Sequence, residues 1–230
     1  MAAWLSKWGP LAGVISALLF VASFVSGSST PDDNASGQYV IQWYTTHHNR
    51  QMLSDVLLTL AMFFLAVFGA TLARHVRRGD RWIATGAFGG AVCAAIGLTS
   101  IVGFDMVLAT NTTHLTPASA QTLNLLANDF FLPVVLGFAL LAVLGGLAVV
   151  AGRILPAWMG WVLFVIGIAA LVPPISWFAL LGTMLWVLIA GIWMAVQGPP
   201  AVEQAEPAAA GERVLAYGAG QIEQGRRHRA

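Results

Sequence analysis

Charge is scarce in this chain. Asp, Glu, Lys and Arg make up 9% of its 230 residues, whereas 58% of the residues are hydrophobic. Soluble domains carry roughly a quarter charged residues. The shortage therefore argues against an ordinary water-soluble domain and is typical of a protein that lies in a lipid bilayer.

Cysteine and several catalytic motifs are also missing. The single cysteine, Cys93, lies in an apolar run, so an intramolecular disulfide, a CxxC redox pair and a cysteine-rich zinc site are excluded. The chain contains no GxSxG nucleophile elbow, no P-loop and no dinucleotide-binding glycine fingerprint. It also lacks the histidine pairs within spans that a b-type haem needs. The sequence implies no particular cofactor.

What the chain does contain is a series of long apolar runs. Each is close to the ~20 residues that an α-helix needs to cross a hydrocarbon core of ~30 Å. Unbroken runs disfavour a β-barrel, whose strands alternate apolar and polar residues. The adjacent Pro173 and Pro174 split the last long run in two, because neighbouring prolines do not fit inside a helix. We therefore predict an all-α, polytopic transmembrane bundle of about six spans, at residues 9–27, 52–73, 82–104, 122–150, 154–172 and 175–196.

The segments outside these spans have recognisable patterns. Residues 37–51 are expected to form an outer interfacial helix leading into the second span. Thr116 followed by Pro117 is a good helix start, with the hydroxyl as cap and proline at the first position. Residues 198–230 are rich in Pro, Ala, Gly, Glu and Gln and are expected to be a disordered cytoplasmic tail. The first apolar run has a second interpretation, a cleaved secretory signal peptide, although Trp4 and Trp8 favour a retained span.

The cationic residues predict the orientation. With the N-terminus inside, Arg50 is the one cation left outside. The cytoplasmic side then holds Lys7, Arg74, Arg77, Arg78, Arg81, Arg153, Arg213, Arg226, Arg227 and Arg229. Tryptophans also fall near the expected span ends, as an aromatic belt requires, at Trp43, Trp82, Trp158, Trp161, Trp177 and Trp193. Both signals predict a multi-pass protein of the plasma membrane with both termini in the cytoplasm.

The predicted spans imply the lipid bilayer as a partner, and no nucleic-acid partner is expected. Arg226, Arg227 and Arg229 could contact anionic headgroups, each for ~1 kcal/mol near the surface. Within the spans, small residues at i and i+4 favour close helix packing. They include Gly86 and Gly90, and Ala142 with Gly146. Pro133 is expected to kink the fourth span.

The candidate functional residues are polar groups near the outer ends of the apolar runs. Asp55, Asp105 and Asp129 are the candidate catalytic residues, because a carboxylate near hydrocarbon costs several kcal/mol unless it is paired or protonated. Candidate binding residues lie in the segments that reach the same surface. They are Arg50, His47, His48, His114, Asn128 and Asn124.

Three hypotheses account for this set. In the first, Arg50 pairs with an aspartate, His and Asn side chains satisfy the others, and the cluster ties helix ends together. In the second, Asp and His hold a divalent metal, although no HExxH or similar spacing is present. In the third, one aspartate carries a proton in transport or acts as a general acid on a lipid or isoprenoid substrate.

Four motifs are similar to those of small six-span membrane proteins of actinobacteria. They are His-Asn-Arg at 48–50, Arg-His-x-Arg-Arg at 74–78, Leu-Asn-x-Leu-x-x-Asp-Phe-Phe-x-Pro at 123–133, and Leu-Pro-x-Trp-x-Gly-Trp at 155–161. The resemblance covers about residues 10–196. It implies a six-span helical membrane domain and draws attention to Asp129 and Pro133, and it implies no catalytic role.

The sequence alone therefore predicts an integral membrane protein with an accessory or structural role. The alternative is a membrane-embedded enzyme or a proton-linked small transporter that uses the outer Asp and His residues. A cavity discriminates between them, because a functional cluster needs access to water or lipid and a structural one needs none.

Overall fold

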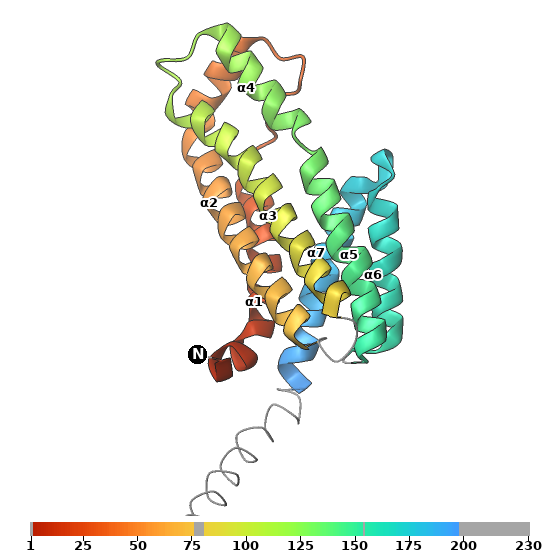
Figure 1. Ribbon diagram of the computed structural model, residues 1–230. Helices are drawn as coiled ribbons and strands as arrows, with labels where there is room; N and C mark the ends of the chain where they lie inside the picture. Colours follow the sequence, from red (N-terminus) through yellow and green to blue (C-terminus); the bar gives the residue numbers. More distant parts are fainter. Residues whose placement is uncertain (1, 76–80, 154, 198–230) are drawn as a thin grey trace, which may run out of the picture. The chain divides into compact units, whose positions relative to one another are not determined.

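The computed structural model describes residues 2–75, 81–153 and 155–197, and within these ranges it consists of helices joined by short segments, without a strand (Figure 1). The helices are α1 (Ala2–Ser26), α2 (Gly37–His75), α3 (Arg81–Thr110), α4 (Pro117–Asp129), α5 (Leu132–Gly152), α6 (Ala157–Ala170) and α7 (Pro173–Gln197). The predicted all-α bundle is confirmed.

Five apolar segments are long enough to cross a membrane: α1, α2, α3, α4 together with α5, and α7. The helix α6 is shorter, with 14 residues where the sequence suggested a span over 154–172. At 1.5 Å per residue it measures about 21 Å, less than a hydrocarbon core of ~30 Å. The proline pair does separate α6 from α7, as predicted, because α7 begins at Pro173.

The apolar helices pack in a closed ring in which each contacts the next. Ser16 on α1 donates a hydrogen bond to the Ala61 carbonyl on α2 (2.8 Å). Glycines then bring α2 to α3, α3 to α5 and α5 to α6, at Gly69, Gly90 and Gly146. The Trp186 indole on α7 donates to the Met159 carbonyl on α6 (2.9 Å). Gly191 on α7 lies against α1 and closes the ring, so α1 packs as one of its walls.

The two ends of the bundle differ in charge. The beginning of α1 and the end of α7 lie at one end, and α4 lies at the other (Figure 1). Arg74, Arg81 and Arg153 occupy helix ends beside the two termini of the bundle. All acidic residues of the described ranges lie toward the α4 end, at Asp32, Asp33, Asp55, Asp105 and Asp129. The bundle thus has a basic end and an acidic end.

The helix α2 is longer than the predicted span. Residues 37–51, expected as a separate interfacial helix, form its first turns, and its 39 residues measure roughly 58 Å. The first part of α2 packs with the end of α3 and with α4 around Val40, Tyr44 and Leu108. Trp43 is buried in this cluster (8% exposed), so its ring contacts protein. Trp82, Trp158 and Trp161 are exposed near the basic end, and the aromatic belt stays a prediction.

The predicted fourth span is divided. The Thr116 hydroxyl accepts the Ser119 backbone N–H and Pro117 opens α4, so the predicted helix start is confirmed. The helix stops at Asp129, and α5 begins at Leu132. Pro133 explains the break, because its ring lacks an N–H and clashes with the carbonyl four residues earlier, at Asp129. The expected kink is therefore a full interruption.

Some predictions fall outside the described residues. The tail at 198–230, with the proposed lipid contacts of Arg226, Arg227 and Arg229, lies outside them, as do Arg77 and Arg78.

Candidate functional site

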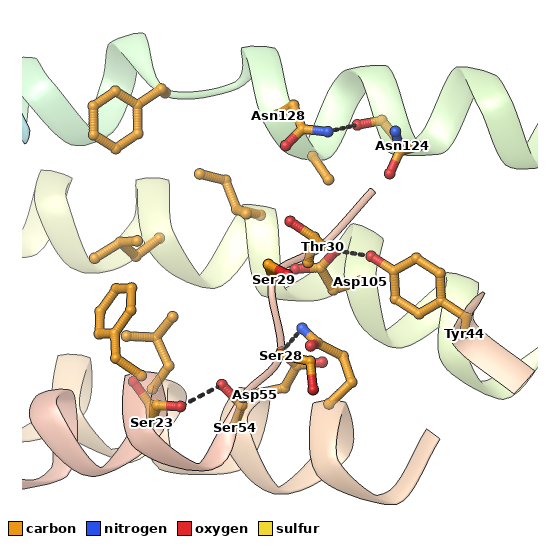
Figure 2. A pocket seen from close by; sticks show the side chains of 18 of the residues that line it. Ser23, Ser28, Ser29, Thr30, Tyr44, Ser54, Asp55, Asp105, Asn124 and Asn128 are labelled. Carbon is orange, nitrogen blue, oxygen red and sulfur yellow. Dashed lines mark hydrogen bonds between the residues drawn. The ribbon is translucent and has the colours of Figure 1, made fainter. Parts of the chain in front are cut away.

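A cavity of about 420 Å³ lies near the α4 end of the bundle (Figure 2). The end of α1, the linker to α2, and helices α2, α3 and α4 surround it. Its polar lining consists of Ser23, Ser28, Ser29, Thr30, Tyr44, Gln51, Ser54, Asp55, Asp105, Asn124 and Asn128. Its apolar lining consists of Phe24, Leu58, Leu98, Ile101, Ala127, Phe131 and Trp177. The volume lies in the range of small-molecule sites, roughly 300–1,000 Å³.

Asp105, near the end of α3, is held by a residue far away in the sequence. The Tyr44 hydroxyl donates to Asp105 Oδ1 at 2.6 Å, and both side chains are buried (Figure 2). Hydrogen bonds from a hydroxyl to a carboxylate are short and strong. This bond joins the first part of α2 to the end of α3 and fixes the direction of the carboxyl group.

Asp55, on α2, is satisfied on one side only. Gln51, one turn earlier, donates its amide N–H to Asp55 Oδ1 at 3.0 Å. Asp55 is only 2% exposed, and its other oxygen, Oδ2, has no hydrogen-bond partner among the described residues. A buried acceptor without a donor costs roughly 1–3 kcal/mol, and more when it is charged. Asp55 therefore has an unused acceptor in a side chain that lines the cavity.

Two asparagines of α4 hold the α1–α2 linker over the cavity. Asn124 donates to the Asp32 carbonyl at 3.0 Å, and Asn128 donates to the Pro31 carbonyl at 3.2 Å. The side-chain oxygen of Asn124, which is 1% exposed, has no partner among the described residues. It is a second unused acceptor beside the same cavity.

The remaining candidates lie elsewhere. Arg50 donates to the carbonyls of Ser26 and Gly27 and so caps the end of α1. The predicted ion pair of Arg50 with an aspartate is therefore wrong for the described residues, because the exposed carbonyls at the end of α1 attract the guanidinium. Asp129 is exposed at the end of α4 and does not line the cavity.

The histidines also lie apart from the carboxylates. The His47 ring stacks on Trp43, with centroids 4.6 Å apart, and its Nδ1 bonds to the Trp43 carbonyl. His48 Nδ1 bonds to the Ala109 carbonyl at 2.9 Å, and His114 is exposed. In the part of the chain that the structure describes, no group of three or more His, Cys, Asp or Glu side chains is close enough to hold a metal.

Tyr44 and the linker were missed by reasoning from the sequence. Tyr44 stands 61 residues from Asp105, and nothing in the spacing connects them. Ser28 and Ser29 follow the first apolar run and were not among the candidate residues. Gln51 stands one helical turn from Asp55 and shares a helix face with it, which the sequence does indicate, although Gln51 was not among the candidate site residues.

The chemistry of the cavity is that of an acceptor-rich site. It holds two carboxyl groups, two amide side chains and several hydroxyls, and none of its described lining residues is Lys, Arg or His. Such a set suits a ligand that donates hydrogen bonds and carries positive charge. Comparison of the chain with family models, with curated proteins and with solved structures found no match.

Proposed function

We propose that this integral membrane protein binds a small cationic, hydrogen-bond-donating molecule in the cavity between α1, α2, α3 and α4. Asp55 and Asp105 would supply the negative charge, and Asn124 a further acceptor. An ammonium group offers several N–H donors and one positive charge, so it meets both needs. Transport and sensing are the kinds of role that such a site serves in a membrane.

One observation carries this proposal: two carboxyl groups share a cavity in which the described residues provide no cation. An ionised pair of this kind costs several kcal/mol unless a positive charge joins it. The unused acceptors Asp55 Oδ2 and Asn124 Oδ1 mark where its donors would bind.

The purely structural hypothesis fits this arrangement less well. It required Arg50 to neutralise an aspartate, and Arg50 binds the end of α1 instead. A cluster that only ties helix ends together also needs no cavity of about 420 Å³. The third hypothesis gives an aspartate a role in transport. The cavity supports this hypothesis for Asp55 and Asp105.

Removing either cavity carboxylate is expected to weaken the binding of small amines. In purified protein reconstituted in lipid nanodiscs, Asp55→Asn and Asp105→Asn should each raise the Kd of hexylamine at least tenfold. A hydrogen bond to a charged group contributes roughly 1.5–3 kcal/mol, which corresponds to a factor of this size. Isothermal titration calorimetry measures the change.

The matched control is Asp33→Asn. Asp33 is an exposed carboxylate of the linker at the same end of the bundle and does not line the cavity, so its loss should leave the Kd unchanged. Asp129→Asn tests the remaining sequence prediction in the same assay. Equal Kd values for wild type, Asp55→Asn and Asp105→Asn would overturn the proposed site.

The proposal includes an orientation in the plasma membrane, with the basic end in the cytoplasm and α4 outside. Arg74, Arg81 and Arg153 at one end support it, because cytoplasmic segments are rich in Lys and Arg. The resemblance to six-span actinobacterial proteins is in keeping with both termini being cytoplasmic.

Cysteine labelling tests the orientation. In a Cys93→Ala background, Ser36→Cys and Asn111→Cys should react with a membrane-impermeant maleimide in intact cells. Gly79→Cys, between Arg74 and Arg81 in the sequence, should react only after the cells are opened. Labelling of Gly79→Cys from outside would reverse the proposed orientation.

A further inference from the structure

The cavity changes in character along the bundle. Its polar groups, with Tyr44, Asp55 and Asp105, lie toward α4 (Figure 2). On α3, Ile101 and Leu98 follow Asp105 at intervals of about one turn toward the basic end, and on α2 Leu58 does the same after Asp55. The cavity thus has a polar part and an apolar part.

The two parts lie at different depths along the bundle. Measured along α3 from Arg81 at 1.5 Å per residue, Asp105 lies about 36 Å and Leu98 about 26 Å away. Along α2 from Arg74, Asp55 lies about 28 Å and Leu58 about 24 Å away. A hydrocarbon core measures ~30 Å. With the arginines at one interface, Asp105 reaches the headgroup level of the other, Asp55 lies at the edge of the hydrocarbon core, and the leucines lie within the acyl chains.

The wall between α1 and α7 is one side chain thick at this depth. Phe24 on α1 and Trp177 on α7 both line the cavity, and they are 48% and 41% exposed. Their rings meet edge to face, with centroids 5.6 Å apart, and Trp177 also contacts Phe131 at 5.9 Å. Two aromatic side chains thus separate the apolar part of the cavity from the surface that faces lipid.

We infer that the ligand is an amphipathic amine taken from the bilayer, which enters between Phe24 and Trp177. This inference rests on the proposed function. Its ammonium head binds Asp55 and Asp105 near the headgroup level, and its apolar chain lies along Leu58, Leu98 and Ile101. An amine dissolved in the membrane already has its head and chain at these two depths, so it reaches the site by lateral movement.

Chain length is the first test. Binding of radiolabelled ethylamine, hexylamine and decylamine to nanodiscs is measured by scintillation proximity, with the signal of Asp55→Asn discs subtracted to remove partition into lipid. Each methylene that leaves water adds a factor of roughly four. We therefore expect the Kd for decylamine to be at least a hundredfold below that for ethylamine. Equal Kd values for the two amines would overturn the inference.

The entry route is tested by rates. Trp177→Ala and Phe24→Ala should each accelerate the association and dissociation of decylamine at least fivefold, because they open the wall. The matched controls are Phe178→Ala and Val25→Ala, which remove neighbouring side chains that are exposed (70% and 75%) and do not line the cavity. Rates that are the same in all four variants would exclude this route.

The proposed function and the amphipathic ligand have separate tests. If wild-type discs bind no amine beyond the Asp55→Asn background, the proposed function itself is wrong. If ethylamine binds and depends on Asp55, but neither chain length nor the aromatic wall matters, the proposed function stands and the amphipathic ligand is wrong.

Discussion

Gly137→Val is expected to prevent stable assembly of the bundle. A β-carbon on Gly137 of α5 would fall on the backbone of Cys93 and Ala94 in α3, and one on Gly90 of α3 would fall on the backbone of Leu140 and Leu141 in α5. The two helices therefore approach each other closely at two glycines, one on each helix, and each glycine faces the backbone of the other helix. Overpacking a core with added methylenes costs typically about 1–3 kcal/mol, and backbone atoms relieve a clash less readily than flexible side chains. We expect Gly137→Val to lower the free energy of unfolding by an amount at or above the upper end of this range.

The measurement is the thermal unfolding midpoint in detergent, together with the elution profile on size-exclusion chromatography. Gly137→Val and Gly90→Val should aggregate or unfold many degrees below wild type. The control is Gly89→Val, in the same helix, because a β-carbon there meets nothing within 4 Å. If Gly89→Val and Gly90→Val unfold at the same temperature, the close approach of α3 and α5 does not exist.

Asp55→Asn is expected to stabilise the ligand-free protein while it removes binding. The variant keeps an oxygen to accept from Gln51, and it replaces a buried carboxylate that has an unpaired oxygen by a neutral amide. A partly satisfied buried charge destabilises a fold, and functional groups often carry such a cost. For a chain of this size each kcal/mol corresponds to about 2–4 °C. The thermal midpoint without ligand should therefore rise by several degrees.

The same scan compares Asp55→Asn with Asp33→Asn, which changes an exposed carboxylate and should leave the midpoint within a degree of wild type. A fall of several degrees in Asp55→Asn would show that this carboxylate holds the helices together. That result would support the structural hypothesis, in which the polar cluster ties helix ends together and the cavity has no role in binding.

Much of the architecture could be predicted from the sequence. The length of the apolar runs predicted the membrane helices, and Pro173 with Pro174 predicted the turn between the last two. Thr116 and Pro117 predicted the start of α4. These features depend on local rules: the number of apolar residues that cross a bilayer, the missing N–H of proline, and the capping of a helix start by a hydroxyl. Each is decided within a few residues of the chain.

The candidate site was predictable only in part. Asp55 and Asp105 were selected because carboxylates near hydrocarbon are costly, and Asn124 and Asn128 because their segment reaches the same surface; the structure brings all four to one cavity. These two rules also selected Asp129, His47 and His114, which lie elsewhere, because a helix position near the interface does not say which way a side chain points. Spacing within one helix identifies a face, but it does not identify the neighbour of that face.

The sequence by itself therefore determined an all-helical fold with helices long and apolar enough to cross a membrane, where its chain turns, and which polar residues lie near one end of the bundle. Only the tertiary structure decided that Tyr44 donates to Asp105 across 61 residues, that Arg50 binds the end of α1, and that Gly137 faces Ala94. The physical reason is that helix formation and membrane insertion are local. The partner of a buried donor, charge or glycine is set by how the helices pack.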